Sequence, residues 1–236
     1  MSEQYTGSEN LEVMLDAVNY NGYLRQLVRE HAADSRSALD FGAGIGTFTT
    51  AIDVPAGEIV CVEPDMRARQ QLSDQGYQVV ADIEEVSRRD LDYIFSLNVL
   101  EHIEDDAAAM AAIFRRLRPG GRLFIYVPAF DHLRTSMDDL VGHYRRYTRR
   151  SLAQVVTGAG FVVEKSAYTD FLGYFATLLF SLMDRFRSSP DGRLSKPLLI
   201  FYDRVCFPFS RLLSVIFQRL AGKNVYIVAR KPVTDP

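Results

Sequence analysis

Apolar residues recur at helical spacing over residues 8–31, where leucine, methionine and valine positions form one stripe and predict an amphipathic helix. From residue 37 the pattern changes to short apolar runs separated by longer mixed stretches. The runs at 38–41, 59–63, 78–81, 93–97 and 122–127 predict strands, and the stretches near 46–52, 66–75 and 105–117 predict helices. This alternation indicates βαβ units, which build a mostly parallel sheet with helices on both faces.

The second half of the chain departs from this alternation. Residues 148–158, begun by Thr148 as a favourable N-cap, predict a helix, and residues 161–166 and 225–230 predict strands. More than fifty aromatic-rich, amphipathic residues separate those two strands. They predict two helices, at 170–186 and 195–220, joined by turn-forming residues at 188–192. Pro208 predicts a break or kink in the second helix.

We expect these elements to form one domain, because 236 residues suit a single core with elaborations. Residues 1–34 would be a helical cap and 35–168 the α/β core. Residues 169–222 would be a helical insertion, which acts either as a lid over the ligand site or as extra core packing. Residues 223–236 would form the final strand and tail.

Charge and cysteine content exclude several classes of partner and ligand. The net charge is −3, whereas nucleic-acid-binding domains are usually strongly basic, so no nucleic-acid partner is expected. The two cysteines make no disulfide framework, and no Cys/His cluster has zinc spacing, so we expect no metal. A cytoplasmic location fits, since the N-terminus lacks a signal-peptide pattern and no uncharged apolar run reaches the about 18–20 residues of a membrane span.

The most specific pattern is a glycine-rich turn after the first predicted strand, with Gly42, Gly44 and Gly46 alternating and Asp40 just before them. Glycines let a ligand approach the backbone closely, although a tight turn without ligand is the alternative. A dinucleotide site needs G-x-G-x-x-G, and Thr47 stands where its third glycine belongs. The Asp40 carboxylate would repel a pyrophosphate but suit an ammonium group. The turn therefore favours S-adenosylmethionine (SAM) over NAD.

Over about residues 37–166 the sequence resembles the class I SAM-dependent methyltransferase family. Asp40, Gly42, Gly44 and Gly46 match the first motif, which in that family cradles the methionyl part of SAM. Glu63 matches the acidic residue at the end of the second strand, which there accepts hydrogen bonds from the ribose hydroxyls. A solvated strand end is the alternative for Glu63. The resemblance implies a Rossmann-like, seven-stranded sheet with SAM as cofactor.

Three further segments extend the resemblance. Asp82 and the backbone of Ile83 match the position beside the adenine, although Asp82 is also a favourable helix cap. Residues 96–103, which include Asn98, resemble the segment beside the transferable methyl group, and residues 117–123 resemble the turn before the fifth strand. Ligands of open α/β sheets bind at the carboxyl ends of the strands, where all these residues are expected.

Basic and aromatic residues crowd the stretch that follows the fifth predicted strand. They suggest a site for an anionic group, while the alternative is a solvated loop in which Arg145 or Arg146 pairs with Asp138 or Asp139. The candidate acceptor-binding residues, one of them on the N-terminal helix, are Tyr20, His132, Tyr144, Arg145 and Arg146. The family lacks a fixed catalytic base. For a hydroxyl acceptor His102, His132 or His143 could serve as the base, and we take His102 and His143 as the catalytic candidates.

The segments around 98–102, 128–129 and 142–147 resemble a methyltransferase subgroup whose members accompany glycosyltransferases and other cell-surface or natural-product assembly genes. That resemblance implies an oxygen acceptor, a hydroxyl or carboxylate of a small molecule, sugar, lipid-linked or peptide-like anionic compound. The Asn/Asp-Pro-Pro-Tyr motif of nucleic-base methyltransferases is absent at 96–99. The alternatives are a non-catalytic partner subunit of a glycosyltransferase or biosynthetic complex, and a dinucleotide-dependent sugar-modifying enzyme.

The predicted helix at 195–220 combines broad apolar surface with Arg204, Arg211 and Arg219, which recur near one helical face. Such a helix lies at a membrane interface, forms a homodimer seam, or packs on its own domain. The charges and Pro208 argue against a spanning helix. We therefore expect a monomer or homodimer, with peripheral contact at the inner membrane face as one use of this segment.

Overall fold

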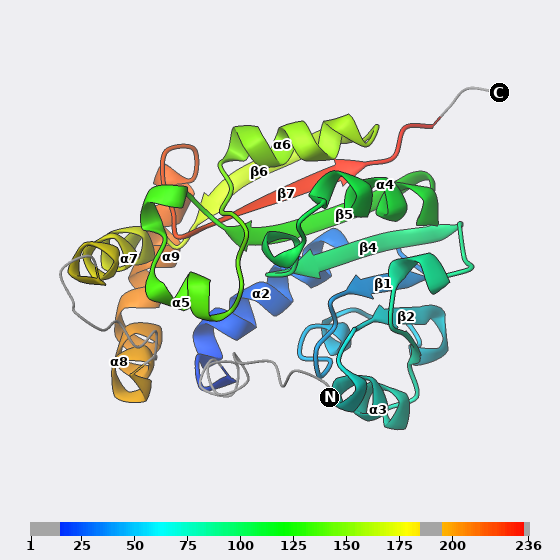
Figure 1. The fold of residues 1–236 in the computed structure, drawn as a ribbon, viewed down its shortest axis with the longest axis horizontal. Coiled ribbons are helices and arrows are strands. Elements are labelled where there is room, and N and C mark those ends of the chain that lie inside the picture. Colours follow the sequence, from blue (N-terminus) through cyan, green and yellow to red (C-terminus); the bar gives the residue numbers. More distant parts are fainter. Residues whose placement is uncertain (1–14, 185–194, 234–236) are drawn as a thin grey trace.

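The strands of the computed structural model, which describes residues 15–184 and 195–233, form one seven-stranded sheet in the order β3-β2-β1-β4-β5-β7-β6 (Figure 1). Strand β7 runs antiparallel to β5 and β6, and the other neighbouring pairs are parallel. The predicted mostly parallel, Rossmann-like sheet is confirmed. Its strands are β1 (Ala38–Phe41), β2 (Ile59–Val62), β3 (Gln78–Val80), β4 (Leu91–Leu97), β5 (Leu117–Pro128), β6 (Val162–Thr169) and β7 (Asn224–Arg230).

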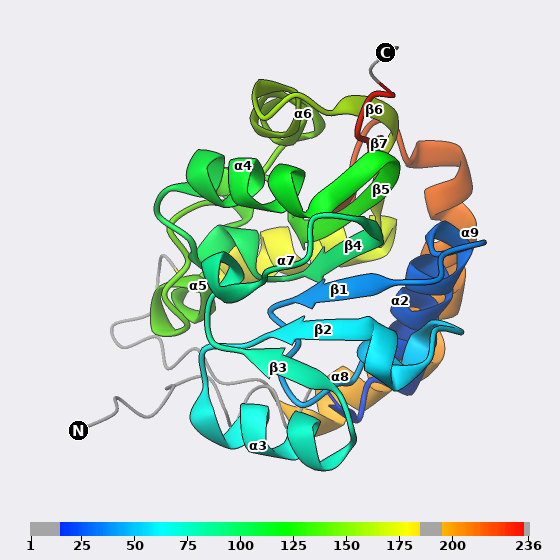
Figure 2. The ribbon, with the colours of Figure 1, turned by 90° about the vertical axis from the view of Figure 1, so that its right-hand side faces the viewer.

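Helices cover both faces of the sheet, as Figure 2 shows. Helices α4 (Asp106–Arg116) and α6 (Arg149–Gly158) lie on one face, and α2 (Val18–His31) and α9 (Phe207–Phe217) lie on the other. Helix α3 (Met66–Asp74) flanks the β2–β3 edge. The buried side chains fall into two clusters, one on each side of the sheet, because successive strand residues point to opposite faces.

Local capping explains where several helices begin. The Thr148 hydroxyl accepts a hydrogen bond from the backbone N–H of Ser151 at 3.0 Å, so the predicted cap of α6 is confirmed. Asp65 caps α3 and Asp105 caps α4 in the same manner. The Asp65 cap starts α3 three residues beyond the carboxyl end of β2, whereas the 3₁₀ turn η4 (Leu100–His102) lies between β4 and the Asp105 cap of α4.

Three boundaries differ from the predictions. The helix expected near 46–52 is only a 3₁₀ turn, η1 (Thr49–Ala51), because Gly42, Gly44 and Gly46 all have positive φ and Pro55 follows soon after. The turn expected at 118–121 is instead the irregular start of β5, which pairs with β4 from Leu117. The described part of the N-terminal helix begins at Val18, and residues 8–14, which were also predicted to be helical, lie outside the described residues. Residues 185–194 lie outside them too, and they include the predicted end of the 170–186 helix and the predicted turn at 188–192.

The insertion before β7 consists of α7 (Phe171–Asp184), α8 (Lys196–Phe201), a π-helical turn η6 (Tyr202–Cys206) and α9. Pro208 lies in the first turn of α9, directly after the π-helical residues. Proline lacks an N–H and crowds the carbonyl four residues earlier, and a wider turn relieves this crowding. Pro208 thus marks a local widening of a helical run that continues through it. Among the described residues, no helix is long and apolar enough to cross a bilayer.

A carboxylate of the insertion supplies the N-cap of the N-terminal helix. Asp203 is buried, and its two oxygens accept the backbone N–H groups of Asn19 at 3.0 Å and Tyr20 at 2.8 Å. These N–H groups belong to the first turn of α2, which has no other side-chain cap. The negative charge of Asp203 also interacts favourably with the positive, N-terminal end of the α2 helix dipole. The contact fixes the insertion against the N-terminal helix.

We predict that Asp203→Ala lowers the free energy of unfolding by about 1–3 kcal/mol, because two N–H groups lose a charged acceptor. Urea denaturation measures this change. Asp90→Ala is the matched control, since Asp90 is exposed and its pairing with Arg88 is at the surface, and its expected change is within about 0.5 kcal/mol. An Asp203 effect no larger than that of the control would contradict the capping role.

Candidate active site

The glycine-rich turn lies at the carboxyl end of β1, and its glycines are required for different reasons. Gly42 has φ +82°, and a Cβ there would lie 2.2 Å from Cγ2 of Val99, so close packing excludes any side chain. Gly44 has φ +54°, and a Cβ there would meet no atom of the described chain within 4 Å. The turn is therefore packed against the end of β4 at Gly42 and open at Gly44, as a turn that admits a ligand to its backbone must be.

Glu63 follows β2 and is bound to the same turn. One carboxylate oxygen accepts the N–H of Gly44 at 2.8 Å, and the other accepts the N–H of Asp65 at 2.9 Å. The side chain is buried, so the alternative of a solvated strand end does not hold. A carboxylate has about four acceptor positions, so two remain for a vicinal diol. The donor chemistry of this site fits the ribose of SAM.

Asp40 connects β1 to the segment that follows the glycine-rich turn. Its carboxylate is buried and accepts a hydrogen bond from the Thr49 hydroxyl at 2.6 Å. Burial raises the pKa of Asp40 to about 7, although the Thr49 hydrogen bond opposes that rise. Asp40 therefore links β1 to η1 through the protein interior. Its contact with the ammonium group of SAM stays a prediction.

The residues expected beside the adenine have local structural roles. Asp82 is exposed and accepts the N–H of Glu84 at 2.8 Å, so it caps the short turn η3 (Ile83–Glu85), which was the alternative given for it. Ile83 is buried in the core, and its carbonyl accepts a hydrogen bond from Arg116. The segment remains at the cofactor edge, because the N–H of Glu63 donates to the carbonyl of Val80 at the end of β3.

The end of β4 turns sharply at Asn98, which is exposed and has φ +54°. The N–H of Asn98 donates to the carbonyl of Tyr126 on β5 at 2.8 Å, and this bond holds the turn against the neighbouring strand. Val99 then packs on Gly42, and the 3₁₀ turn η4 (Leu100–His102) follows. The segment that resembled the neighbourhood of the transferable methyl group thus contacts the cofactor turn directly.

Glu101, His102 and His143 lie together beyond this contact, and we call them the β4 triad. Glu101 is fully buried, neither carboxylate oxygen has a hydrogen-bond partner among the described residues, and burial raises its pKa to about 8. Nε2 of His143 lies 3.9 Å from Oε1 of Glu101, and the His102 and His143 rings are 4.5 Å apart. Burial, followed by the nearby charge of His143, lowers the pKa of His102 to about 4, so His102 is neutral near pH 7.

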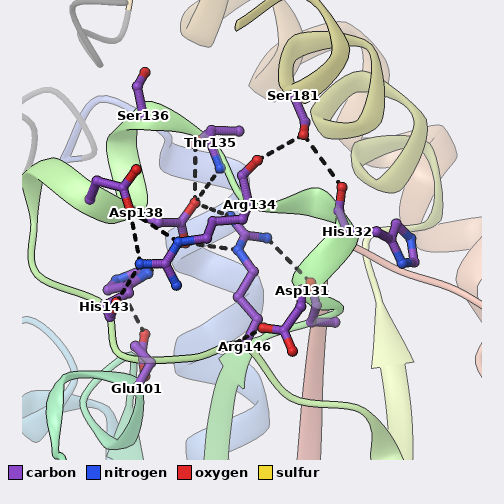
Figure 3. Close-up of polar contacts among 12 residues, drawn as sticks. Glu101, Asp131, His132, Arg134, Thr135, Ser136, Asp138, His143, Arg146 and Ser181 are labelled. Carbon is purple, nitrogen blue, oxygen red and sulfur yellow. Dashed lines mark hydrogen bonds and ion pairs between the residues drawn. The ribbon is translucent and has the colours of Figure 1, made fainter. Parts of the chain in front are cut away.

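His143 is held in place by Asp138 of α5 (Ser136–Leu140), as Figure 3 shows. The buried carboxylate of Asp138 accepts hydrogen bonds from His143 Nδ1 at 2.7 Å, from two nitrogens of Arg146 at 2.8 and 2.9 Å, and from the N–H of Thr135. Burial alone would raise the pKa of Asp138, but the hydrogen bonds from His143 and Arg146 outweigh it and hold the pKa well below its usual range. Asp138 is therefore ionised, and Nδ1 of His143 is the donor.

The predicted anion site at Arg145 and Arg146 needs correction. Arg146 is 7% exposed at its side chain and bound to Asp138, so it is not free to bind an acceptor. Arg145 pairs with Asp106 at 2.8 Å. Asp139, which was considered as a partner for Arg145 or Arg146, pairs with Arg134 instead. The alternative of a paired loop holds, because the carboxylates that neutralise these arginines come from α5 and from the start of α4.

The other predicted acceptor residues do not join the triad. His132 hydrogen-bonds to the hydroxyl of Tyr174 at 3.0 Å and points away from His143 (Figure 3). Tyr20 extends into the protein, and its hydroxyl lies 3.2 Å from that of Tyr126. Tyr144 is exposed next to the triad, and its N–H donates to the carbonyl of Glu101. Of these three side chains, only Tyr144 is available at the site.

Two important side chains, Glu101 and Asp138, were given no site role from the sequence. Glu101 precedes His102 in the expected methyl-transfer segment, and Asp138 was considered only as an arginine partner. The available signal was the coincidence of a Glu-His pair after a predicted buried strand with a second histidine in the arginine-rich stretch. The positions of Glu101 and Asp138 in the sequence do not predict that the two residues come together in the fold.

Comparison with known proteins agrees with this geometry. A family model described as a methyltransferase domain matches residues 12–166, well over half of the chain. An uncharacterized 37.1 kDa protein in transposon TN4556 of Streptomyces fradiae is 31% identical over 176 residues, which are 64% of this chain and 47% of that protein. The matched part therefore spans about half the length of this curated relative.

Solved structures show the same fold. A possible histamine N-methyltransferase of Thermotoga maritima superposes with a TM-score of 0.63 over 94% of each chain at 16% identity. Phosphoethanolamine N-methyltransferase 2 of Haemonchus contortus, solved with SAM, gives a TM-score of 0.59 over 89% of this chain and 52% of that one at 18% identity. At these identities the likeness concerns the fold alone.

The chain belongs to the methyltransferase-domain family, and within it to the class I SAM-dependent methyltransferases. SAM is its cofactor, and the open backbone at Gly44 and the Glu63 carboxylate are the features that fit it. The prediction that the cofactor is SAM is confirmed, and its location over the glycine-rich turn stays a prediction. The contacts of individual residues with SAM stay predictions.

We predict that Gly44→Ala weakens SAM binding at least tenfold, equivalent to about 1.4 kcal/mol, because the new methyl group enters the open space above the turn. Calorimetric titration with SAM measures the affinity. Gly76→Ala is a matched control, since Gly76 also has positive φ and open space but lies at the turn between α3 and β3. Both variants carry a similar conformational cost of about 1–2 kcal/mol. Equal SAM affinity in the two variants would place the cofactor elsewhere.

Proposed function

We propose that this protein transfers the methyl group of SAM to an oxygen atom, a hydroxyl or carboxylate, of a small-molecule, sugar or lipid-linked acceptor. The observation that carries the proposal is the β4 triad. Two imidazoles and a buried carboxyl group lie just beyond Val99, the residue that packs on the cofactor turn. A hydroxyl must lose its proton during methyl transfer, and imidazole is the most frequent group that assists this step.

SAM supplies a methyl group on a positively charged sulfur, which makes that carbon an electrophile. The chain must bring an acceptor oxygen in line with it and remove the acceptor's proton. The open backbone at Gly44 and the Glu63 carboxylate support binding of the cofactor at one side. The triad supports binding of the acceptor oxygen at the other, where the new C–O bond forms as the C–S bond breaks. A carboxylate acceptor needs no deprotonation, only exclusion of water and orientation.

The acceptor class is testable without knowing the acceptor. We expect the protein to transfer radiolabelled methyl from SAM into a small-molecule and lipid extract of the cells that make it. Methyl esters release the label as methanol in mild alkali, and methyl ethers release it as methyl iodide in hydriodic acid. Label resistant to both treatments is attached to nitrogen or carbon and would contradict the proposal.

The triad's part is tested in the same assay. We expect His143→Gln to lower the rate by about 10²–10⁴-fold, the usual contribution of a proton-transferring group, with SAM affinity unchanged. His132→Gln is the control, because His132 is a histidine of the same edge that contacts Tyr174 instead. SAM binding by the native protein without any transfer would favour the alternative of a non-catalytic partner subunit.

The helical insertion supports a membrane-associated acceptor, because α9 carries its apolar side outward. Its buried residues include Ser210 and Ser214, whose hydroxyls accept the N–H groups of Leu172 and Phe171 at the start of α7. The large apolar residues of α9 that remain exposed, by 63–70%, are Phe209, Leu212, Val215 and Ile216. Neighbouring exposed apolar residues on α7 and η6 are Phe175, Leu179, Leu182, Met183 and Val205. Both α7 and η6 contact α9, and soluble monomers rarely leave so many large apolar side chains exposed on neighbouring helices without a partner.

The charge of the insertion indicates what kind of partner covers its apolar surface. Residues 195–223 contain five basic residues and one acidic residue, a net charge of +4 in a chain of net −3. The single acid, Asp203, is buried as the α2 cap, whereas Arg204 and Arg219 are exposed. Arg211 instead stacks on Tyr23 of α2. An apolar surface flanked by exposed arginines matches an anionic lipid surface. We propose that the insertion rests on such a membrane and brings the site to a lipid-linked acceptor.

We expect the protein to float with vesicles that contain phosphatidylglycerol, to bind less at high salt, and to bind weakly to pure phosphatidylcholine. Leu212→Glu combined with Ile216→Glu should abolish flotation while leaving SAM binding intact. Val162→Glu, at an exposed apolar position on β6, is the control. A protein that ignores vesicles but forms dimers by light scattering, lost in the double variant, would assign the surface to a homodimer.

A further inference from the structure

The Glu101 side chain is unusual for a native protein. It is fully buried, and neither of its oxygens has a hydrogen-bond partner among the described residues. Burying a carboxyl group without partners is costly, and nearly all such groups are satisfied. Most other buried carboxylates here follow that rule, since Asp138, Asp170 and Asp203 each accept several hydrogen bonds. An orphaned carboxyl at the ligand edge of the sheet points to a partner that the described residues do not supply.

The atoms around Glu101 form the donor set of a metal site. One ligand atom from each of Glu101, His102 and His143 lies within 4.8 Å of the other two. Nε2 of His143 is 3.9 Å from Oε1 of Glu101. Ligands about 2.1 Å from one ion are at most about 4.2 Å apart, so the Glu101–His143 pair lies within that limit. A pair at the 4.8 Å bound must close by about 0.6 Å to reach it, and a tetrahedral arrangement, with ligands about 3.4 Å apart, requires further closing. Side-chain rotation supplies movements of that size.

Asp138 gives the site its outer shell. It accepts a hydrogen bond from Nδ1 of His143, which leaves Nε2 directed at Glu101 (Figure 3). Histidines that bind metals usually donate their other N–H to a carboxylate or carbonyl, which fixes the ring and its tautomer. The imidazole of His143 is thus oriented by a group outside the triad.

We propose that Glu101, His102 and His143 bind one divalent transition-metal ion, which holds the acceptor oxygen during methyl transfer. Two imidazoles and one carboxylate suit zinc, iron or manganese better than calcium or magnesium, which prefer oxygen ligands. Sequence analysis predicted no metal, because no Cys/His cluster has zinc spacing, and His102 and His143 are 41 residues apart. Strand β5 and α5 bring His143 back to the end of β4.

The catalytic part of this inference rests on the proposed function. An ion held by the triad would make His143 a ligand, so the imidazole would no longer take the proton of the acceptor hydroxyl. The positive charge instead lowers the pKa of a bound hydroxyl, and its proton leaves to water as the C–O bond forms. Metal binding itself requires neither SAM nor an acceptor, so it is measured separately.

The test begins with chelator-treated full-length protein titrated with Zn²⁺ by calorimetry and with Co²⁺ by visible absorption. We expect one ion per chain, a Co²⁺ spectrum typical of nitrogen and oxygen ligands, and a melting temperature that rises with Zn²⁺ concentration. Asp138→Asn should weaken Zn²⁺ binding by about 10- to 100-fold, and Glu101→Gln should weaken it further. His132→Gln, outside the triad, should leave it unchanged.

Folding of each variant is checked by SAM affinity and by the melting temperature without metal. Glu101→Gln should not melt lower than the native protein in chelator, since it replaces an unpartnered buried carboxyl group. Zn²⁺ affinity that is the same in the native protein and in Glu101→Gln would overturn the proposal, as would absence of binding. Zn²⁺ binding without methyl transfer would contradict only the proposed function, and transfer undiminished by chelator would remove the ion's catalytic role.

Discussion

The buried carboxylate of Asp138 is the interaction on which the candidate acceptor site depends. It is a charge inside the protein, stabilised because Arg146, His143 and the N–H of Thr135 all donate to it. An isolated buried charge would be strongly unfavourable, so the loop after β5 must keep all of these partners in place. Arg146 neutralises the carboxylate, and His143 receives a fixed orientation as a result. The arginine acts on the site indirectly, through the residue it neutralises.

Packing at the sheet edge connects this loop to the cofactor. Val99 fills the space that a side chain at Gly42 would need, so the end of β4 and the glycine-rich turn have to adopt their conformations together. Glu101 and His102 follow within three residues and face His143. The short segment that follows β4 therefore determines how far the cofactor turn lies from the triad. Substitutions at Val99 and in the triad would both change the rate through this distance.

The fold and the cofactor turn were predictable because their signals are local. Alternating apolar runs determine strands, and Gly42, Gly44 and Gly46 form a turn within five residues. The triad was not predictable in the same way, since His143 reaches Glu101 only after the chain has passed through β5 and α5. Arg146 was misassigned because sequence reveals a charge but not whether it is buried beside a carboxylate. Periodicity likewise indicated an apolar face on α9, but not that Ser210 and Ser214 would occupy the inward side.

The central claim is that Asp138 presents Nε2 of His143 to Glu101 beside the bound cofactor. Nitrogen NMR of the imidazole rings in ¹⁵N-histidine-labelled protein tests it most directly, because ring shifts and couplings identify which nitrogen carries the proton. The account predicts that neutral His143 is protonated at Nδ1, and that SAM perturbs the His102 and His143 signals while leaving those of His31, packed on Phe124 at the far end of α2, unchanged. Protonation of neutral His143 at Nε2, or triad signals that do not respond to SAM, would contradict it.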